Sequence, residues 1–189
     1  MGIYRKNKPT AGLKEVTFMK SKIRQTITAA VFAALICAAT MLIRIPTLTK
    51  GYVNLGDCVI LIAGWVCGAQ WGFAAAGIGS ALADIISGYA LFAPGTFAVK
   101  GIMAVLAALI AAVFRHRVFL GRTVSAAAAE IFMALGYFVY EWLFIVGSPE
   151  AAVIGIPENL IQGMVGLLSA VAVMTALEKT RALQVLNLK

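Results

Sequence analysis

A series of long apolar runs, separated by short polar or Gly- and Pro-containing segments, limits this chain more than any other feature. A helix needs about 20 mostly apolar residues to cross the hydrocarbon core of a bilayer. Such runs occupy most of the chain between residues 23 and 178. We therefore predict an all-α polytopic membrane protein with six transmembrane helices. The expected spans are residues 23–45, 57–69, 73–87, 96–114, 123–146 and 157–177.

The composition agrees with membrane spans and excludes several classes of protein. Of the 189 residues, 61% are hydrophobic and only 13% are charged, whereas soluble domains usually carry about 25% charged residues. A soluble enzyme, a disordered tail and a disulfide-stapled secreted module are therefore excluded. The expected organisation is a basic cytosolic arm at 1–22, a six-helix transmembrane domain at 23–178 and a cytosolic tail at 179–189.

The second and third spans are expected to form a hairpin, with Gln70-Trp71-Gly72 as its turn. The second span is short, so a tilted or partly inserted helix fits it as well as a full crossing.

The positive charges predict an orientation. Of the 16 Lys and Arg residues, 13 lie before residue 25, between residues 115 and 122, or after residue 178. With an even number of spans these segments share one side, and the cytoplasmic flanks of membrane proteins are enriched in Lys and Arg. We therefore predict a cell-membrane protein with both termini in the cytoplasm. The net charge of +8 is mostly a topology signal.

Three ionisable residues near the outer ends of spans are the best clue to function. Asp84 lies near the end of span three, Lys100 near the start of span four and Glu141 near the end of span five. A charge at the centre of a span costs about 2.5–3.5 kcal/mol, so such residues need a reason. At about 1.5 Å of rise per residue, the three fall in one outer layer, and we expect them to meet. Alternatively, Asp84 and Lys100 only neutralise each other.

Other polar and aromatic residues are expected at the same outer level. Asp57 opens span two and Asn159 opens span six, while Tyr89 and Tyr137 lie in the second outer loop and late in span five. An apolar, aromatic concave site with a few placed polar groups suits a small heterocyclic ligand. Alternatively, the aromatic residues form an interfacial belt.

The remaining reactive residues are expected to be structural. Glu130 is interpreted as a buried, hydrogen-bonded carboxylate that fixes packing, and His116 as a solvated loop residue. The three cysteines fall within or beside apolar runs and are read as small packing residues; they are Cys37, Cys58 and Cys67. The chain has one histidine and no phosphate-binding loop of the form G-x-x-x-x-G-K-[ST]. We therefore expect no metal site, no other cofactor, no ATP hydrolysis by this chain and no nucleic-acid partner.

Small residues recur every fourth position in two places, which lets helices approach closely in lipid. Ala30, Ala34 and Ala38 form such a stripe in the first span, and Gly64, Gly68 and Gly72 form one in the hairpin. We interpret the glycines as packing within the protein and the alanines as a contact with another subunit.

An ordered series of motifs resembles a known family. It comprises Tyr52-Val53-Asn54-Leu55-Gly56-Asp57, Gly77-Ile78-Gly79-Ser80-Ala81-Leu82-Ala83-Asp84, Gly88-Tyr89, Pro94, Thr96-Phe97 and Lys100-Gly101. Over about residues 23–178 the chain is similar to the substrate-binding S components of energy-coupling factor (ECF) transporters, most of all to the riboflavin-type branch.

The resemblance implies a membrane subunit, not an enzyme, that captures a small water-soluble vitamin or precursor from outside. It implies as partners a transmembrane T component and two cytosolic ATPases, with the alanine stripe meeting the T component. The implied ligand pocket lies at the outer side. Its candidate residues are Asn54, Asp57, Asp84, Tyr89, Lys100, Tyr137, Glu141 and Asn159.

Riboflavin, pyridoxine or a thiamine-precursor pyrimidine would suit such a pocket. The rival interpretation is a self-contained small-molecule facilitator or a structural membrane subunit without a ligand.

Overall fold

The structure is a computed structural model that describes residues 11–42, 44–46 and 52–180. Its first element, α1 (Ala11–Leu42), begins within the segment predicted as an arm, and its apolar part is Ser21–Leu42. The helix ends three residues earlier than the predicted first span. Residues 1–10 of the predicted arm and residues 181–189 of the predicted tail lie outside the described residues.

A short antiparallel hairpin follows α1 where the sequence suggested only a loop. Strand β1 (Arg44–Pro46) pairs with β2 (Tyr52–Asn54), with Arg44 opposite Asn54 and Pro46 opposite Tyr52. Over residues 11–42, 44–46 and 52–180 the regular structure is therefore helical except for this ribbon. Asn54, at the end of β2, leads directly into the next helix and is positioned by the pairing.

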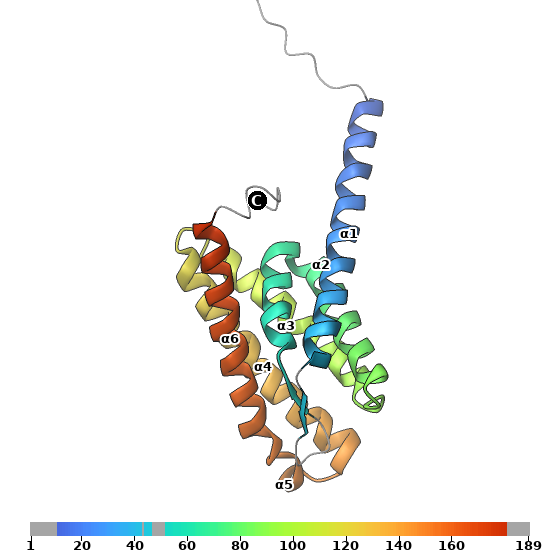
Figure 1. The fold of residues 1–189 in the computed structure, drawn as a ribbon, viewed down its shortest axis with the longest axis vertical. Helices are drawn as coiled ribbons and strands as arrows, with labels where there is room; N and C mark the ends of the chain where they lie inside the picture. The colour runs from blue at the N-terminus through green and yellow to red at the C-terminus, as the bar shows by residue number, and fades with distance from the viewer. Residues whose placement is uncertain (1–10, 43, 47–51, 181–189) are drawn as a thin grey trace, which may run out of the picture.

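Helix α2 (Gly56–Ile86) contains the predicted hairpin, but its break lies at Gly68 and not at 70–72. Gly68 has φ 77° and ψ 179°, a conformation open essentially only to glycine. The two arms then fold back on each other. Their close packing is shown by Gly72, where a Cβ would stand 3.1 Å from the Cα of Gly64. In a continuous helix these two positions would be about 12 Å apart. In Figure 1 the teal first arm and the green second arm run in opposite directions.

The later elements are α3 (Ala93–Val113), α4 (Val118–Tyr140), a π-helical turn η1 (Glu141–Val146), the short α5 (Pro149–Ala152) and α6 (Gly155–Lys179). Proline lies in the first turn of both α3 and α5, where its missing N–H leaves no intrahelical bond unmade. Gly147, with φ 77°, ends η1 in the left-handed region.

Among the described residues, five helical segments are long and apolar enough to cross a membrane. The count is five where the sequence predicted six, because predicted spans two and three together form the single element α2. Helix α2 packs against α1, α3 and α6, and α4 packs between α3 and α6. The bundle is thus organised around the two arms of α2.

The bundle interior consists mainly of small residues, and large apolar side chains point outward. Ala104, Ala107 and Ala126 are fully buried, whereas Leu109 and Leu135 are more than half exposed. Lipid tails are as apolar as leucine, so close packing of small residues holds such helices together. Accordingly, a Cβ on Gly64 would lie 2.5 Å from the Ala104 carbonyl oxygen. The internal packing predicted for Gly64 and Gly72 is confirmed, whereas Gly68 serves the break.

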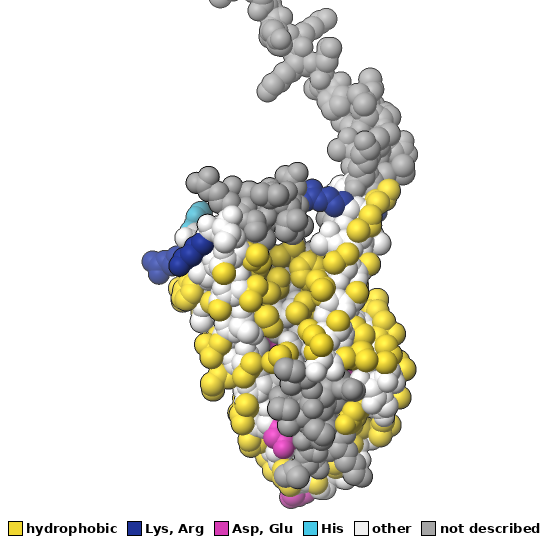
Figure 2. Space-filling view, viewed as in Figure 1, with side chains coloured by type: hydrophobic (Ala, Val, Ile, Leu, Met, Phe, Trp, Pro, Cys, Tyr) yellow, Lys and Arg dark blue, Asp and Glu magenta, His cyan; other side chains and the backbone are white. Residues whose placement is uncertain are grey.

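The charges separate along the long axis of the bundle. In Figure 1 the start of α1, the α3–α4 turn and the end of α6 lie at one end, and the β hairpin and α5 lie at the other. Figure 2 shows Lys and Arg at the first end, Asp and Glu toward the second, and a mainly apolar body between them. Both ends of the described chain therefore reach the basic end. His116 is exposed in the basic turn, as predicted.

Candidate functional site

The ion pair between Asp57 and Lys100 is the centre of a buried polar cluster near the β hairpin. Asp57 lies in the first turn of α2, where a carboxylate is favoured by the helix dipole, and Lys100 lies two turns into α3. The Lys100 Nζ is 2.5 Å from Oδ1 of Asp57, and the two side chains are 2% and 1% exposed. Such a pair is tolerated in an apolar interior only when its remaining hydrogen-bonding positions are also satisfied.

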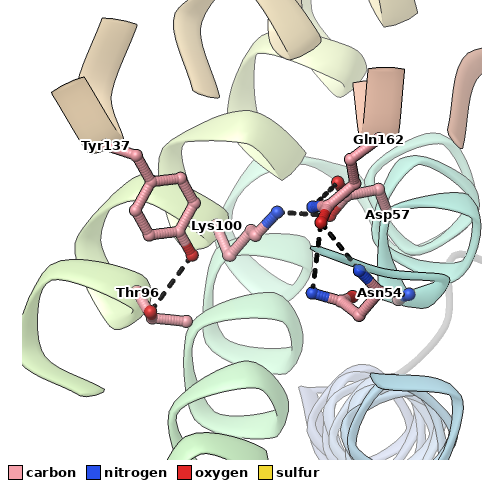
Figure 3. Close-up of polar contacts among 7 residues, drawn as sticks. Asn54, Asp57, Thr96, Lys100, Tyr137 and Gln162 are labelled. Atoms are coloured by element: carbon pink, nitrogen blue, oxygen red, sulfur yellow. Dashed lines mark hydrogen bonds and ion pairs between the residues drawn. The ribbon is translucent and has the colours of Figure 1, made fainter. Parts of the chain in front are cut away.

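Gln162 of α6 provides a hydrogen bond to the second carboxylate oxygen of Asp57 and so connects α6 with α2 and the hairpin. Its Nε2 donates to Oδ2 of Asp57 at 2.5 Å, and its Oε1 accepts from the backbone N–H of Asn54 at 2.8 Å. The Asn54 Oδ1 in turn accepts from the N–H of Gly56 at 2.8 Å. Figure 3 shows Lys100 and Gln162 meeting at the Asp57 carboxylate, with Asn54 bonded to Gln162. The hairpin, α2, α3 and α6 are thereby held at one point.

Tyr137 of α4 covers the other side of Lys100. The Nζ of Lys100 lies 5.3 Å from the centre of the Tyr137 ring, within the range of a cation–π interaction. The Tyr137 hydroxyl and Oγ1 of Thr96 share a hydrogen bond of 3.1 Å. An aromatic face, a hydroxyl pair and a charged pair therefore lie together (Figure 3).

Gly56 permits this arrangement by leaving room for its neighbours. A Cβ there would stand 2.1 Å from Oγ1 of Thr40 and 2.8 Å from Oδ1 of Asn54. A larger residue would therefore push α1 and β2 away from the first turn of α2.

Glu130 is buried beside this cluster, as the sequence suggested. The hydrogen bonds expected for its carboxylate are not found in the part of the chain that the structure describes. It is 5% exposed, and neither carboxylate oxygen has a hydrogen-bond partner among the described residues. Both its Oε1 and the Cβ of Asp57 lie within 2.8 Å of the point where a Cβ of Gly166 would stand. Glycine at position 166 of α6 thus lets the two acidic side chains come close to each other.

Four of the eight predicted site residues come together in this cluster: Asn54, Asp57, Lys100 and Tyr137. The sequence did not pair Lys100 with Asp57, which is its partner in a buried ion pair; the expected meeting of Lys100 with Asp84 and Glu141 stays a prediction. Asp57 reaches Lys100 because the first arm of α2 packs directly against α3.

The other predicted residues lie near the same end of the bundle. Asp84 and Glu141 are each 3% exposed, at the end of α2 and the start of η1. Tyr89 is half-buried, and its N–H donates to the Asp84 carbonyl at 2.8 Å. Asn159 is half-buried in the first turns of α6.

Sequence reasoning missed Gln162 and Thr96 as members of the cluster. Gln162 is one helical turn beyond Asn159 within an apolar stretch, and a buried amide in such a stretch is itself a signal of a polar partner. Thr96 belongs to a quoted motif, but its hydroxyl alone gave no reason to select it.

The predicted partner stripe lies on an exposed face. Ala30, Ala34 and Ala38 of α1 are all exposed, whereas Ala29 is buried and the backbone of Ala33 contacts α2 at Gly79. The smooth ridge is thus directed away from the bundle, so it is free to contact lipid or a second protein. The cysteines are all unpaired and half-buried in α1 and α2.

The chemistry of the cluster suits binding. Within the described ranges, no three His, Cys, Asp or Glu side chains are grouped so as to hold a metal ion. The groups present are a charged pair, amides, hydroxyls and an aromatic ring in an apolar surrounding, which can orient the polar edge of a small molecule.

Comparisons with known proteins agree with this architecture. The sequence profile of the family described as "ECF-type riboflavin transporter, S component" matches residues 20–179. An uncharacterised protein of Pyrococcus woesei is 32% identical over 136 residues, which are 70% of this chain and 87% of that protein.

A solved structure has the same fold. It comes from work on the structure and mechanism of the S component of a bacterial ECF transporter, and it superposes with a TM-score of 0.71 at 17% identity. The match covers 84% of this chain and 98% of the other. At this identity the likeness shows the fold alone, and the family assignment rests on the profile match. The chain belongs to the S-component family of ECF-type riboflavin transporters, a family of transporter subunits.

Proposed function

We propose that this protein is the substrate-binding S component of an ECF-type importer. It captures a small water-soluble vitamin or precursor outside the cell and delivers it together with a T component and two cytosolic ATPases. Riboflavin is the first candidate because the matching family is described by it. Pyridoxine and a thiamine-precursor pyrimidine are the others.

The observation that carries this proposal is the buried polar cluster around Asp57 and Lys100. It lies near the end of the bundle that carries the hairpin, opposite the basic turn, and four elements meet in it. A charged pair so costly to bury favours a role beyond packing, since a well-packed apolar pair is often at least as stable.

The proposed ligand lies on this side of the bundle, with its ring against an aromatic side chain such as Tyr137 or Tyr89. Lys100 and Asp57 address its polar edge, supported by Asn54 from the hairpin. Asp84, Glu141 and Asn159 border the same end and complete the proposed site.

The proposed partner surface is the exposed ridge of Ala30, Ala34 and Ala38. A T component lies against this ridge, and its ATPases drive reorientation of the loaded S component. The chain itself lacks an ATP-binding loop, so energy must come from partners.

The proposed orientation puts both termini and the basic turn in the cytoplasm of a cell-membrane protein. The separation of charge along the bundle supports it, because Lys and Arg accumulate on cytoplasmic flanks. In this topology the two arms of α2 count as separate spans, giving six in total.

Retention of a ligand tests the function directly. The full chain is purified in mild detergent, and native mass spectrometry measures any vitamin bound to it. Titration with riboflavin, pyridoxine and the aminopyrimidine follows, with an unrelated membrane protein as the control. We expect one vitamin to bind with nanomolar to micromolar affinity. If none is retained and none binds, the protein is a facilitator or a structural subunit instead.

A further inference from the structure

A groove between α4 and α6 near the basic end is separate from the proposed ligand site. It has a volume of about 480 Å³, within the range of small-molecule sites. Its walls are one face of the first turns of α4 and one face of the last turns of α6. The lining residues used below are Phe119, Thr123, Leu168, Ala172, Thr175 and Lys179.

The walls of this groove present almost only carbon. The two hydroxyls in them are already used, because Thr123 donates to the Phe119 carbonyl at 3.0 Å and Thr175 donates to the Val171 carbonyl at 2.7 Å. Phe119 and Leu168 are 66% and 61% exposed. Such a surface suits a long apolar ligand, and the described residues of its walls have no free hydroxyl donor for the polar edge of a vitamin.

The rim of the groove carries an uncompensated positive charge. Arg122, beside it, is already paired, with Nη2 at 2.8 Å from Oε1 of Glu178 and its guanidinium 5.8 Å from the Trp65 ring. Lys179 is exposed at the end of α6 and forms no ion pair within the part of the chain that the structure describes. A long lysine side chain at a helix end reaches the headgroup level of the bilayer.

We propose that this groove binds an anionic phospholipid, with one acyl chain between α4 and α6 and the headgroup phosphate on Lys179. Apolar walls below and the Lys179 ammonium above match the two parts of such a lipid. Basic sites between helices near the membrane surface select anionic headgroups. The site does not depend on the vitamin-binding function proposed above.

Competition between lipids in vesicles tests the proposal. The full chain is reconstituted in vesicles of equal parts phosphatidylglycerol and phosphatidylcholine and extracted in mild detergent. Native mass spectrometry then measures the mass of any lipid that stays bound. We expect one phosphatidylglycerol molecule to be retained in preference to phosphatidylcholine. Equal retention of the two lipids, or an adduct of neither, overturns the proposal.

Two variants with matched controls locate the lipid. Ala172→Trp fills the groove and should remove the retained lipid, whereas Ala112→Trp, on an exposed position of α3 near the same end, should not. Lys179→Gln should lower the preference for phosphatidylglycerol about fivefold, and Arg24→Gln should leave it unchanged. Because Lys179 is exposed, this second variant tests the site even if Ala172→Trp does not fold. An unchanged preference in Lys179→Gln overturns the headgroup assignment.

The tail of the chain itself is the other possible occupant. A chain ending at Thr180 should retain the lipid as the full chain does. If the shortened chain retains more lipid, the tail fills the groove in the intact protein and the proposal is wrong.

Discussion

Asp57 and Lys100 are 43 residues apart in the sequence, yet their side chains form a nearly fully buried ion pair of 2.5 Å. The pair joins the first arm of α2 to α3, and Gln162 extends it to α6 and the hairpin. A ligand that meets Lys100 therefore meets a group whose position depends on four elements. This coupling makes the pair a test of both the stability of the bundle and the proposed ligand binding.

Removing one member of the pair should be costly. Lys100→Met leaves the Asp57 carboxylate without its cation, and we expect the free energy of unfolding to fall by about 3–5 kcal/mol. The double variant Asp57→Asn/Lys100→Met removes both charges and should recover most of that loss. Unfolding in a denaturing detergent titration measures both. If the losses of Lys100→Met and of Asp57→Asn, measured separately, simply add in the double variant, the ion pair does not couple these residues.

The same double variant separates binding from stability. Because it restores the fold without the charges, its vitamin affinity reports on the ligand contact alone. We expect the affinity to fall at least tenfold, or about 1.4 kcal/mol, measured by titration with the vitamin that the wild-type protein retains. Wild-type affinity in a stable double variant would show that the charged pair is only structural.

Gln162→Leu should destabilise the hairpin side of the bundle. The change leaves one oxygen of Asp57 and the Asn54 N–H without partners, at a cost of about 1–3 kcal/mol for each buried group. Gln70→Leu, at an exposed position just after the break in α2, is the matched control and should cost little. Thermal unfolding of the two purified variants provides the comparison. Equal melting temperatures would rule out a bridging role for Gln162.

Glu130→Met should stabilise the protein. The methionine has a similar size, and it replaces a buried carboxyl that has no hydrogen-bond partner among the described residues. We expect a gain of about 1–3 kcal/mol in the free energy of unfolding. Glu150→Met, at an exposed position in α5, should have no comparable effect. A loss of stability in Glu130→Met would mean that the carboxyl has a favourable interaction.

Ala34→Trp should block assembly without affecting the ligand. The side chain lies on the exposed ridge of α1, so a large ring there prevents close approach of another helix but disturbs no internal packing. Co-purification with a co-expressed T component should be lost while vitamin affinity stays unchanged. Ala112→Trp serves as the control for a bulky residue elsewhere on the surface. Loss of binding and assembly together would instead indicate that the ridge is internal packing.

Local sequence signals predicted the helices well, since hydropathy depends only on neighbouring residues. The later helices begin or end within a few residues of the predicted limits, with α3 and α6 differing by at most three residues at either end. The sequence places the break in α2 at 70–72, whereas it lies at Gly68. The positive φ of Gly68 follows from the packing of the two arms and cannot be recognised in the sequence. The hairpin was missed because three-residue strands carry too short a pattern to recognise.

Most members of the buried polar cluster were predictable by residue type but not by partner. Asn54, Asp57, Lys100 and Tyr137 stood out because polar groups in or beside apolar spans are costly. Lys100 was paired with Asp84 because depth along the helix was the only coordinate available. Gln162 could not be selected from the sequence, because the sequence does not show in which direction its side chain points from α6.

The amino-acid sequence by itself determined that the chain lies in a membrane, how its charge divides between two ends and which spans carry costly polar groups. Only the tertiary structure decided which of those groups meet. The physical reason is that the rotation of each helix about its axis is set by close contacts, such as Gly64 on Ala104 and Gly79 on Ala33. The first contact turns Asp57 inward toward Lys100, and the second leaves Ala34 outside. On α6, the close approach of Gly166 to Asp57 and Glu130 holds Gln162 on the same side.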